Sequence, residues 1–205
     1  MEALLPKLQI PTDLLTEKQD LDPSTLFKTN RKHTCLEIGF GSGEHLSGLM
    51  RQNPDTNYLG AEPFINGMAA FLKDIINEKN NNIRVIMDDA LLLCHSLTDE
   101  CLDQIYILNP DPWHKTRHHK RRIVNPGNLD CFARILNPGG QLVMSTDVPD
   151  LADWMITHSF NHPTFTWTAK SPEDWRNPPP NWIHTRYETK GAKGARKMTY
   201  LVFQK

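Results

Sequence analysis

The sequence predicts an α/β protein built on a doubly wound, mostly parallel sheet of about seven strands with helices on both faces. Short apolar runs alternate with stretches of helical spacing along most of the chain. A glycine-rich turn follows the first apolar run, as is typical of the first strand-to-helix connection in such sheets. The chain closes on an alternating β-branched and aromatic segment, which indicates a final strand.

The first half of the chain contains predicted strands joined by helices. Short apolar runs predict the strands, at residues 34–39, 57–62, 83–87 and 103–109. Apolar residues spaced three and four apart predict the helices, at residues 44–52 and 64–79 and from about Ala90 onward. Because each strand is followed by a helix, the strands should pair in parallel and end at one common edge.

The second half continues the alternation. A helix is predicted at residues 128–136, a strand at 141–146 and a helix at 151–160. The first of these helices ends at the Asn-Pro-Gly-Gly run of residues 137–140, which is a strong stop signal. Residues 197–204 form the predicted closing strand, with Thr164–Thr168 as its neighbour. Prolines within residues 171–182 exclude a helix there, and the tryptophans of this segment predict a packed loop.

The chain length of 205 residues is enough for one substantial core and predicts a single domain. We expect this domain to span residues 31–205, preceded by an N-terminal extension at residues 1–30 that can be flexible. No signal-peptide pattern and no apolar run long enough to span a membrane is found. The cysteines show no Cys-x-x-Cys pairing, which favours reduced thiols over structural zinc. A cytoplasmic protein without membrane contact is therefore predicted.

Charge is distributed unevenly although the formal net charge is −1. Residues 1–111 hold 9 basic and 17 acidic residues, whereas residues 112–205 hold 14 basic and 7 acidic residues. One interpretation is a chance difference between solvated faces, since charge runs usually lie at the surface. The other is a basic face that binds a nucleic acid.

The turn after the first predicted strand carries Gly39, Gly41 and Gly43, which allow the backbone to approach a ligand closely. A dinucleotide fingerprint would need a further glycine where Glu44 stands, close to the position of a pyrophosphate. The Glu44 carboxylate therefore argues against a dinucleotide. A tight turn without any ligand is the alternative for this motif.

Acids at the predicted strand ends indicate a cofactor that carries positive charge. Glu37 precedes the glycines, and Glu62 ends the second strand, where an acid commonly receives ribose hydroxyls. Asp89 follows the third strand, where it can accept an adenine amino group. The sulfonium and ammonium groups of S-adenosylmethionine suit such a pocket, so these acids favour that cofactor over an empty turn.

The fourth predicted strand ends in Asn-Pro-Asp-Pro-Trp, residues 109–113. Proline fixes its own φ angle and restricts the residue before it, so Asn109 and Asp111 are held at set angles. Rigid placement suits methyl transfer, which depends mainly on the position and orientation of the reactants. A proline turn that caps a strand is the alternative. Trp113 can stack on a base or fill the core behind the turn.

A dense basic segment follows this corner and forms a candidate surface for a polyanion. Its cations are Lys115, Arg117, Lys120, Arg121 and Arg122, with no acid between Pro112 and Leu129. Contacts of this kind position a phosphate backbone without reading its sequence. A second basic group comprises Arg186, Lys190, Lys193, Arg196 and Lys197. The histidines of the first group lack a neighbouring carboxylate, so no metal site is predicted.

Several segments resemble, in order and spacing, the bacterial tRNA (guanine-N7-)-methyltransferase family. They are LEIGFGSGEHL, GAEPFINGM, NIRVIMDDA, NPDPWHKTRHHKRRIV, STD and IHTRYETKG, within residues 33–205. The basic string after Asp-Pro-Trp is highly specific, whereas the glycine turn is not. The resemblance implies a Rossmann-like methyltransferase sheet and an RNA-binding enzyme of tRNA modification. Such an enzyme transfers a methyl group from S-adenosylmethionine to N7 of a guanine in the variable loop of tRNA.

The same resemblance implies roles for individual residues. Cofactor contacts fall at Glu37, Glu62, Asp89 and Asp111, and Asp111 is also the catalytic residue. Substrate contacts fall at Lys115, Asp147, Thr185, Arg186, Tyr187 and Glu188, with Thr185 and Glu188 free to read base edges. Guanine N7 offers a free lone pair, so no strong general base is needed. Asp111 is instead expected to hold the base and to support developing charge.

Asn109 departs from the family, in which phenylalanine commonly precedes Pro-Asp-Pro-Trp. It brings the corner closer to the Asn-Pro-Pro-aromatic corner of amino-group methyltransferases. An enzyme that methylates a nucleic-acid amino group, of the adenine N6 type, is therefore the first alternative. A catalytically inactive RNA-binding subunit is the second, although such a module needs neither the pocket acids nor Asp111. The protein is expected to be a monomer or a homodimer.

Overall fold

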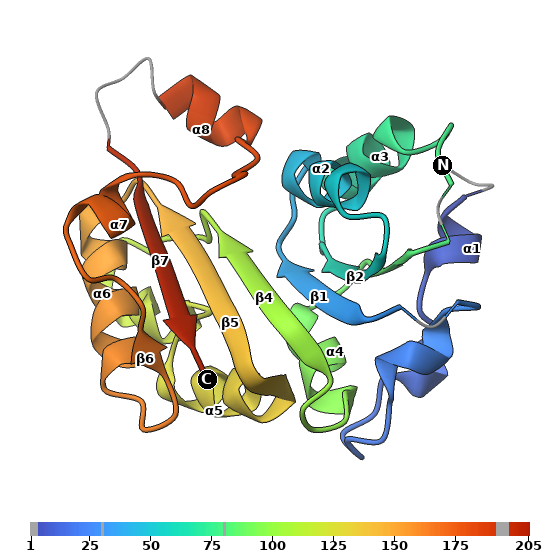
Figure 1. Ribbon diagram of the computed structural model, residues 1–205, viewed down its shortest axis with the longest axis horizontal. Coiled ribbons are helices and arrows are strands. Elements are labelled where there is room, and N and C mark those ends of the chain that lie inside the picture. The colour runs from blue at the N-terminus through green and yellow to red at the C-terminus, as the bar shows by residue number, and fades with distance from the viewer. Residues whose placement is uncertain (1–3, 30, 80, 192–196) are drawn as a thin grey trace.

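A mixed sheet organises the chain in a computed structural model that describes residues 4–29, 31–79, 81–191 and 197–205 (Figure 1). Within these residues, seven strands lie in the order β3-β2-β1-β4-β5-β7-β6. They are β1 His33–Ile38, β2 Thr56–Ala61, β3 Ile83–Ile86, β4 Leu102–Leu108, β5 Leu136–Thr146, β6 Thr166–Trp167 and β7 Thr199–Gln204. Strands β1 to β5 are parallel, while β7 is antiparallel to both β5 and β6. The predicted doubly wound, mostly parallel sheet is confirmed.

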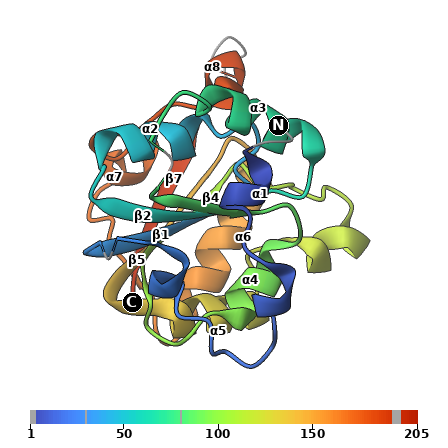
Figure 2. The same ribbon diagram turned by 90° about the vertical axis from the view of Figure 1, so that its right-hand side faces the viewer.

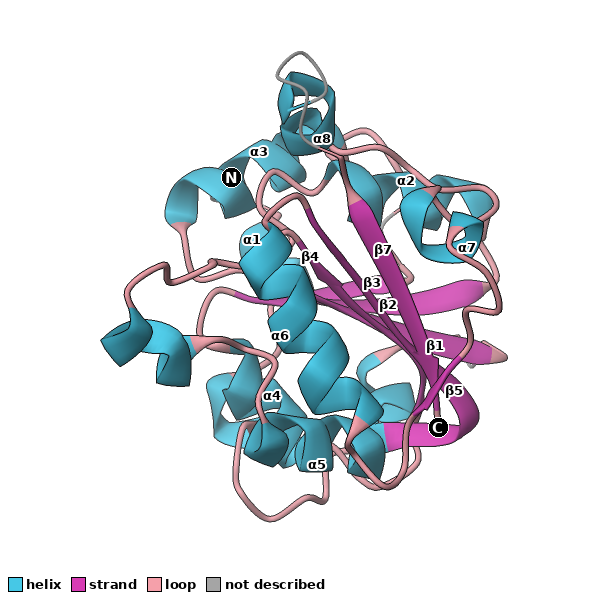
Figure 3. Cartoon of the chain, turned by 90° about the vertical axis from the view of Figure 1, so that its left-hand side faces the viewer, coloured by secondary structure: helices cyan, strands magenta, loops and turns pink. Residues whose placement is uncertain are grey.

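Helices cover both faces of the sheet (Figure 2). On one face lie α2 Glu44–Gln52 and α3 Ile65–Asp74. The other face carries α4 Ala90–Ser96, α5 Pro126–Ile135 and α6 Pro149–Phe160 (Figure 3). The shorter elements are α1 Leu5–Leu8, η1 Thr12–Leu14, η2 Pro23–Leu26, η3 Thr116–Arg121, α7 Glu173–Arg176 and α8 Arg186–Gly191. No helix among the described residues combines the length and the apolar character needed to cross a membrane.

Each face of the sheet buries its own apolar cluster, because alternate side chains of a strand point to opposite faces. In β1, Leu36 and Ile38 belong to the cluster that includes residues of α4, α5 and α6. Cys35 belongs to the cluster that includes residues of α2 and α3. The same alternation directs Glu37 toward α2.

Some observed boundaries differ from the predicted ones. The helix predicted to reach Lys79 stops at Asp74, where the fully buried Ile75 turns the chain. The prolines of residues 171–182 were expected to exclude a helix, but α7 forms between Pro172 and Pro178. Asp174 stabilises the start of α7, because its Oδ2 accepts hydrogen bonds from the N–H groups of Lys170 and Ser171, both at 2.8 Å. Helix α8 has no counterpart among the predicted elements.

The N-terminal extension packs against the domain. Ile10 is fully buried, and its N–H donates to Val85 O of β3 at 2.9 Å. Leu21 N–H donates to Ser96 O at the end of α4 at 3.0 Å, and Phe27 joins the same core cluster. Residues of the extension therefore form part of the hydrophobic core, while its flexibility stays a prediction. The domain boundary at residue 31 stays a prediction.

Candidate functional site

The glycine turn between β1 and α2 presents an open backbone surface. Gly39 and Gly41 have φ angles of +69° and +56°, a left-handed conformation that glycine adopts without steric cost. A Cβ atom added at either position would meet no heavy atom within 4 Å. Gly39 N–H donates to Ala61 O at 2.8 Å and ties the start of the turn to β2. The turn thus forms a cradle in which a ligand can approach the backbone.

Two further glycines allow α3 to pack tightly against this turn. A Cβ atom at Gly43 would lie 2.3 Å from Phe71 Cδ2, and one at Gly67 would lie 2.5 Å from Gly41 O. Gly43 is among the predicted cofactor residues, but the side on which a Cβ atom would project faces Phe71 of α3. Gly67 is a site residue that sequence interpretation missed. The available signal was an isolated glycine within a helical pattern, which usually has a packing reason.

Glu62 holds the glycine turn through its carboxylate. Its Oε2 accepts a hydrogen bond from Gly41 N–H at 2.8 Å, and its Oε1 accepts one from Phe64 N–H at 2.9 Å. The residue is 4% exposed. Because a carboxylate has about four lone-pair positions, Glu62 can hold the turn and still accept hydroxyl groups of a ligand.

A cavity of about 560 Å³ opens at the carboxyl ends of β1 to β4. Of the predicted cofactor residues, Gly39, Glu62, Asp89 and Asp111 all line it. Asp89 also caps α4, since its Oδ1 accepts a hydrogen bond from Leu91 N–H at 2.9 Å. Residues from four separate strand ends therefore meet in one place, as the parallel sheet requires.

Glu37 lies on the α2 face of β1. Its Oε2 is 2.8 Å from Nδ1 of His45, and both side chains are almost completely buried. The His45 ring in turn lies 4.9 Å from the Tyr106 ring and 5.2 Å from the Trp182 ring, measured between centroids. Glu37 is thus held against α2, and its predicted contact with the cofactor stays a prediction.

The Asn-Pro-Asp-Pro-Trp corner contributes to the wall of the cavity and has an unusual backbone. Asn109 and Trp113 have φ angles of +49° and +46°. Such conformations cost of order 1–3 kcal/mol each and persist only where the surroundings fix them. Asn109 N–H donates to Ser145 O at 2.8 Å. Its Oδ1 is buried without a hydrogen-bond partner among the described residues, while Asp111 is exposed.

The basic segment after this corner forms the short 3₁₀ helix η3. Most of its predicted cations are exposed, namely Lys115, Arg117, Lys120 and Arg121. The Arg121 guanidinium lies 5.0 Å from the centroid of the Trp113 ring, within the range of a cation–π contact. Arg121 and Trp113 both line the cavity. The segment therefore presents positive charge at the mouth of the site.

Arg122 is a correction to the predicted RNA contacts. Its side chain is 1% exposed and forms an ion pair with Asp150 of α6. A side chain buried to this degree cannot contact a phosphate group. Sequence alone did not distinguish it from Arg121, because the direction of each side chain depends on where η3 ends.

Residues 185–188 lie close to Asp147, the predicted substrate contact after β5. Tyr187 OH donates to Asp147 Oδ1 at 3.3 Å, and α8 lies beyond the carboxyl ends of β4 and β5 (Figure 1). Arg186 Nε pairs with Glu44 Oε1 at 3.1 Å, at the start of α2. Thr185 Oγ1 accepts a hydrogen bond from Glu188 N–H at 3.3 Å and caps α8.

Glu188 is not free to read a base edge, contrary to the prediction. It is 5% exposed. Its Oε2 accepts a hydrogen bond from Trp182 Nε1 at 3.1 Å and lies 2.9 Å from His184 Nδ1. Of the second basic group, Arg186 and Lys197 are exposed. Lys193 and Arg196 lie outside the described residues, as does the side chain of Lys190.

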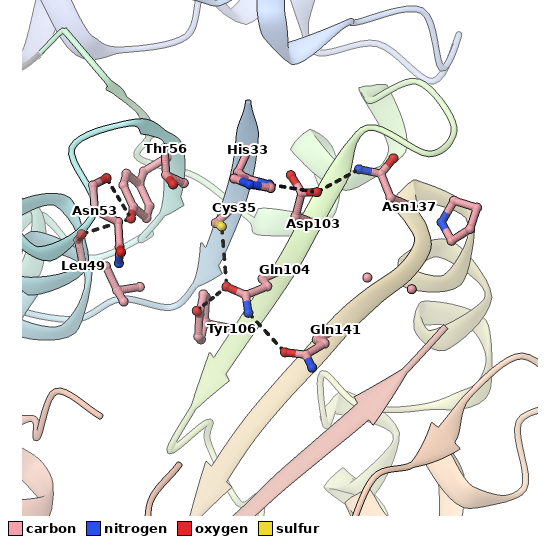
Figure 4. A pocket seen from close by; sticks show the side chains of 14 residues that line it. His33, Cys35, Leu49, Asn53, Thr56, Asp103, Gln104, Tyr106, Asn137 and Gln141 are labelled. Carbon is pink, nitrogen blue, oxygen red and sulfur yellow. Dashed lines mark hydrogen bonds and ion pairs between the residues drawn. The ribbon is translucent and has the colours of Figure 1, made fainter. Parts of the chain in front are cut away.

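A second cavity, of about 400 Å³, lies at the amino ends of the strands (Figure 4). Its polar side chains bind one another: Gln104 Oε1 accepts hydrogen bonds from Tyr106 OH at 2.6 Å and Cys35 Sγ at 3.7 Å. Burial raises the pKa of the Cys35 thiol to about 12, so this thiol stays protonated and unreactive near neutral pH. The predicted site residues lie at the opposite edge of the sheet.

Residues 31–201 match a family described as "Putative methyltransferase". A tRNA (guanine-N(7)-)-methyltransferase of Rhodospirillum rubrum is 40% identical over 205 residues, covering 100% of this chain and 80% of that protein. The enzyme of the same name from Brucella anthropi is 42% identical over 202 residues, covering 98% of this chain and 85% of that protein.

Solved structures of low sequence identity share the fold. The 16S rRNA methyltransferase KamB aligns with a TM-score of 0.57 at 14% identity, covering 85% of this chain and 88% of that chain. SMU.1697c of Streptococcus mutans, described as a putative methyltransferase in complex with SAH, aligns with a TM-score of 0.53 at 12% identity, covering 85% of this chain and 89% of that one.

Proposed function

The chain belongs to the family of tRNA (guanine-N7-)-methyltransferases, and on this premise we propose that the cavity beside Asp111 is its methyl-transfer site. The enzyme transfers a methyl group from S-adenosylmethionine to N7 of a guanine in tRNA. We place the target guanine in the variable loop. The main observation in support of this site is that one cavity is lined by residues from four strand ends, namely Gly39, Glu62, Asp89 and Asp111.

The cavity residues suit S-adenosylmethionine, which supplies a methyl group on a positively charged sulfonium. Gly39 and Gly41 leave open space next to the backbone. Glu62 and Asp89 offer carboxylate oxygens for ribose hydroxyls and for the adenine amino group. The buried Asn109 Oδ1, which has no partner among the described residues, offers an acceptor for a further N–H group. Glu37 is held on the α2 side of β1 by its contact with His45, in the first turn of the helix that follows the glycines.

Asp111 is the proposed catalytic residue. Its carboxylate accepts N–H groups of the guanine, which orients N7 and offsets the positive charge that develops on the base. No proton leaves N7 before the reaction, since this nitrogen carries a free lone pair. Asp111 therefore acts by position and charge, and its exposure at the cavity wall makes it accessible to an incoming base.

The proposed RNA surface runs from η3 to α8. We assign phosphate contacts to the exposed cations Lys115, Arg117, Lys120 and Arg121, and base or sugar contacts to Asp147, Thr185, Arg186 and Tyr187. The major groove of an RNA duplex is too narrow and deep for side chains to read. The guanine must therefore be unstacked from a loop, and Trp113 offers a ring on which it can stack. We also propose that the enzyme works in the cytoplasm as a monomer or a homodimer.

Cleavage chemistry tests the target atom directly. Because 7-methylguanosine becomes labile after borohydride reduction, aniline is expected to cleave treated tRNA at one guanine of the variable loop. Primer extension maps the break, and tRNA incubated without S-adenosylmethionine is the control. Intact chains that nevertheless carry the labelled methyl group would overturn N7 and favour amino-group methylation, the alternative opened by Asn109.

A single phosphate contact should change the salt dependence of binding. Lys120→Ala is expected to weaken tRNA binding and to reduce the slope of log K against log salt by about one unit, since one fewer counterion is released. Filter binding across several salt concentrations measures the slope. Lys7→Ala is the control, because this substitution removes the same charge from α1. Helix α1 lies beside β3, at the edge of the sheet opposite β7 and β6. Equal slopes for Lys120→Ala and the unaltered enzyme would remove Lys120 from the RNA surface.

A further inference from the structure

Arg122 is a buried cation inside an otherwise exposed basic segment. At 1% exposure, it is the largest side chain among the fully buried residues of the described chain. Taking a guanidinium out of water is unfavourable unless its geometry and hydrogen bonds compensate. An apolar side chain of similar volume would fill the same space without that penalty. The positions of its hydrogen-bond partners indicate the role of the buried guanidinium.

The guanidinium joins segments that are distant in sequence. Arg122 Nε donates to Pro112 O at 2.9 Å, and Nη2 donates to Asp150 Oδ2. Nη2 also lies 3.1 Å from His119 Nε2. The group stands 4.9 Å from the centroid of the Trp154 ring, whose Nε1 donates to Val124 O at 2.7 Å. One side chain therefore connects the corner after β4, the turn η3 and the first half of α6.

Asp150 is suited to anchor this connection. It lies in the first turn of α6, where a negative charge interacts favourably with the helix dipole. Its pKa is lowered below the ordinary value, chiefly by the hydrogen bond from Arg122. Only a planar fork can reach the Pro112 carbonyl and the Asp150 carboxylate together. Lysine has a single nitrogen and cannot hold both at this geometry.

The Pro112 carbonyl belongs to the peptide group that joins Pro112 to the strained Trp113, one residue after Asp111. Fixing that carbonyl fixes the plane of the peptide group and thereby limits how the corner can rotate. We propose that Arg122 is a positioning residue for methyl transfer, which locks the Asp111 corner onto α6 without touching the RNA. This inference rests on the proposed role of Asp111. Small displacements of a reacting group can lower a rate by about 100-fold.

Substitutions at both ends of the ion pair test the connection. Arg122→Lys keeps the charge and removes the fork, and Asp150→Asn removes the anchor charge at an exposed position. Arg134→Lys is the matched control, because Arg134 of α5 also donates to a backbone carbonyl and a carboxylate, those of Leu97 and Asp99, at the amino end of β4. Single-turnover methylation at saturating tRNA and S-adenosylmethionine should fall about 100-fold for Arg122→Lys and about tenfold for Asp150→Asn. Arg134→Lys should stay within about twofold. Asp150→Glu, which keeps the charge, should recover most of the rate lost in Asp150→Asn.

Binding measurements separate positioning from other roles. Arg122→Gln should leave the tRNA salt slope and the affinity for S-adenosylmethionine unchanged, because neither ligand touches Arg122. A slope reduced by about one, with an unaltered saturated rate, would make Arg122 a phosphate contact and overturn the proposal. If Asp150→Asn loses rate, cofactor affinity and thermal stability together, the ion pair has only a structural role, and this result would also overturn the proposal.

The same assays keep this inference distinct from the site assignment. If Asp111→Asn retains turnover, the proposed function of the cavity fails whatever the Arg122 variants do. If Asp111→Asn is inactive while Arg122→Lys retains the full rate, only the positioning role fails.

Discussion

Asp111→Asn is expected to slow methyl transfer by about 100- to 1,000-fold, the usual loss when one preorganised electrostatic contact to a transition state is removed. The substitution keeps the size and shape of the side chain and removes only its charge. Asp111 is exposed at the cavity wall, so the fold should not depend on it. Affinity for tRNA should stay within about threefold, because phosphate contacts supply most of the binding.

Single-turnover transfer of a labelled methyl group and filter binding of tRNA measure the two quantities separately. Asp55→Asn is the matched control, since it removes the same charge from a fully exposed position just before β2, at the opposite edge of the sheet. Its rate should equal that of the unaltered enzyme. Parallel losses of rate and tRNA affinity in Asp111→Asn would contradict a purely positional and electrostatic role.

Local sequence signals predicted the sheet and the placement of most acids. Apolar runs fixed the positions of β1 to β4, and parallel pairing then required their carboxyl ends to share one edge. Glu62, Asp89 and Asp111 each stand at such an end, so their meeting in one cavity follows from the alternation of strands and helices. The prolines were expected to restrict Asn109 and Asp111, whereas the positive φ angles of this corner occur at Asn109 and Trp113.

Features set by distant partners were beyond the reach of sequence interpretation. Arg122 and Arg121 are neighbours in one basic run, and Arg122 differs through partners that include Asp150 and Trp154 on a later helix. Glu188 looked available to RNA because its partner Trp182 ends the segment expected to be a loop, and its partner His184 follows where no element was predicted. The N-terminal residues gave no periodic signal, yet Ile10 pairs with β3.

Gly67→Ala is expected to weaken binding of S-adenosylmethionine by about tenfold or more. The added Cβ would lie 2.5 Å from Gly41 O and 3.1 Å from Glu62 Cγ. Backbone at that distance has to move, and overpacking of this kind costs about 1–3 kcal/mol. The movement falls on the glycine turn and on the carboxylate that holds it. Within α3 itself, alanine improves helix propensity by about 1 kcal/mol.

Isothermal titration with S-adenosylmethionine and thermal melting together identify where the substitution acts. Gly127→Ala is the control, because it places the same methyl group in α5, where the nearest atom is Asn125 Oδ1 at 3.7 Å. We expect the control to bind the cofactor normally and Gly67→Ala to lose affinity while remaining folded. If the two variants bind equally well, the glycine turn is not the cofactor cradle, because its displacement would have no effect on the ligand.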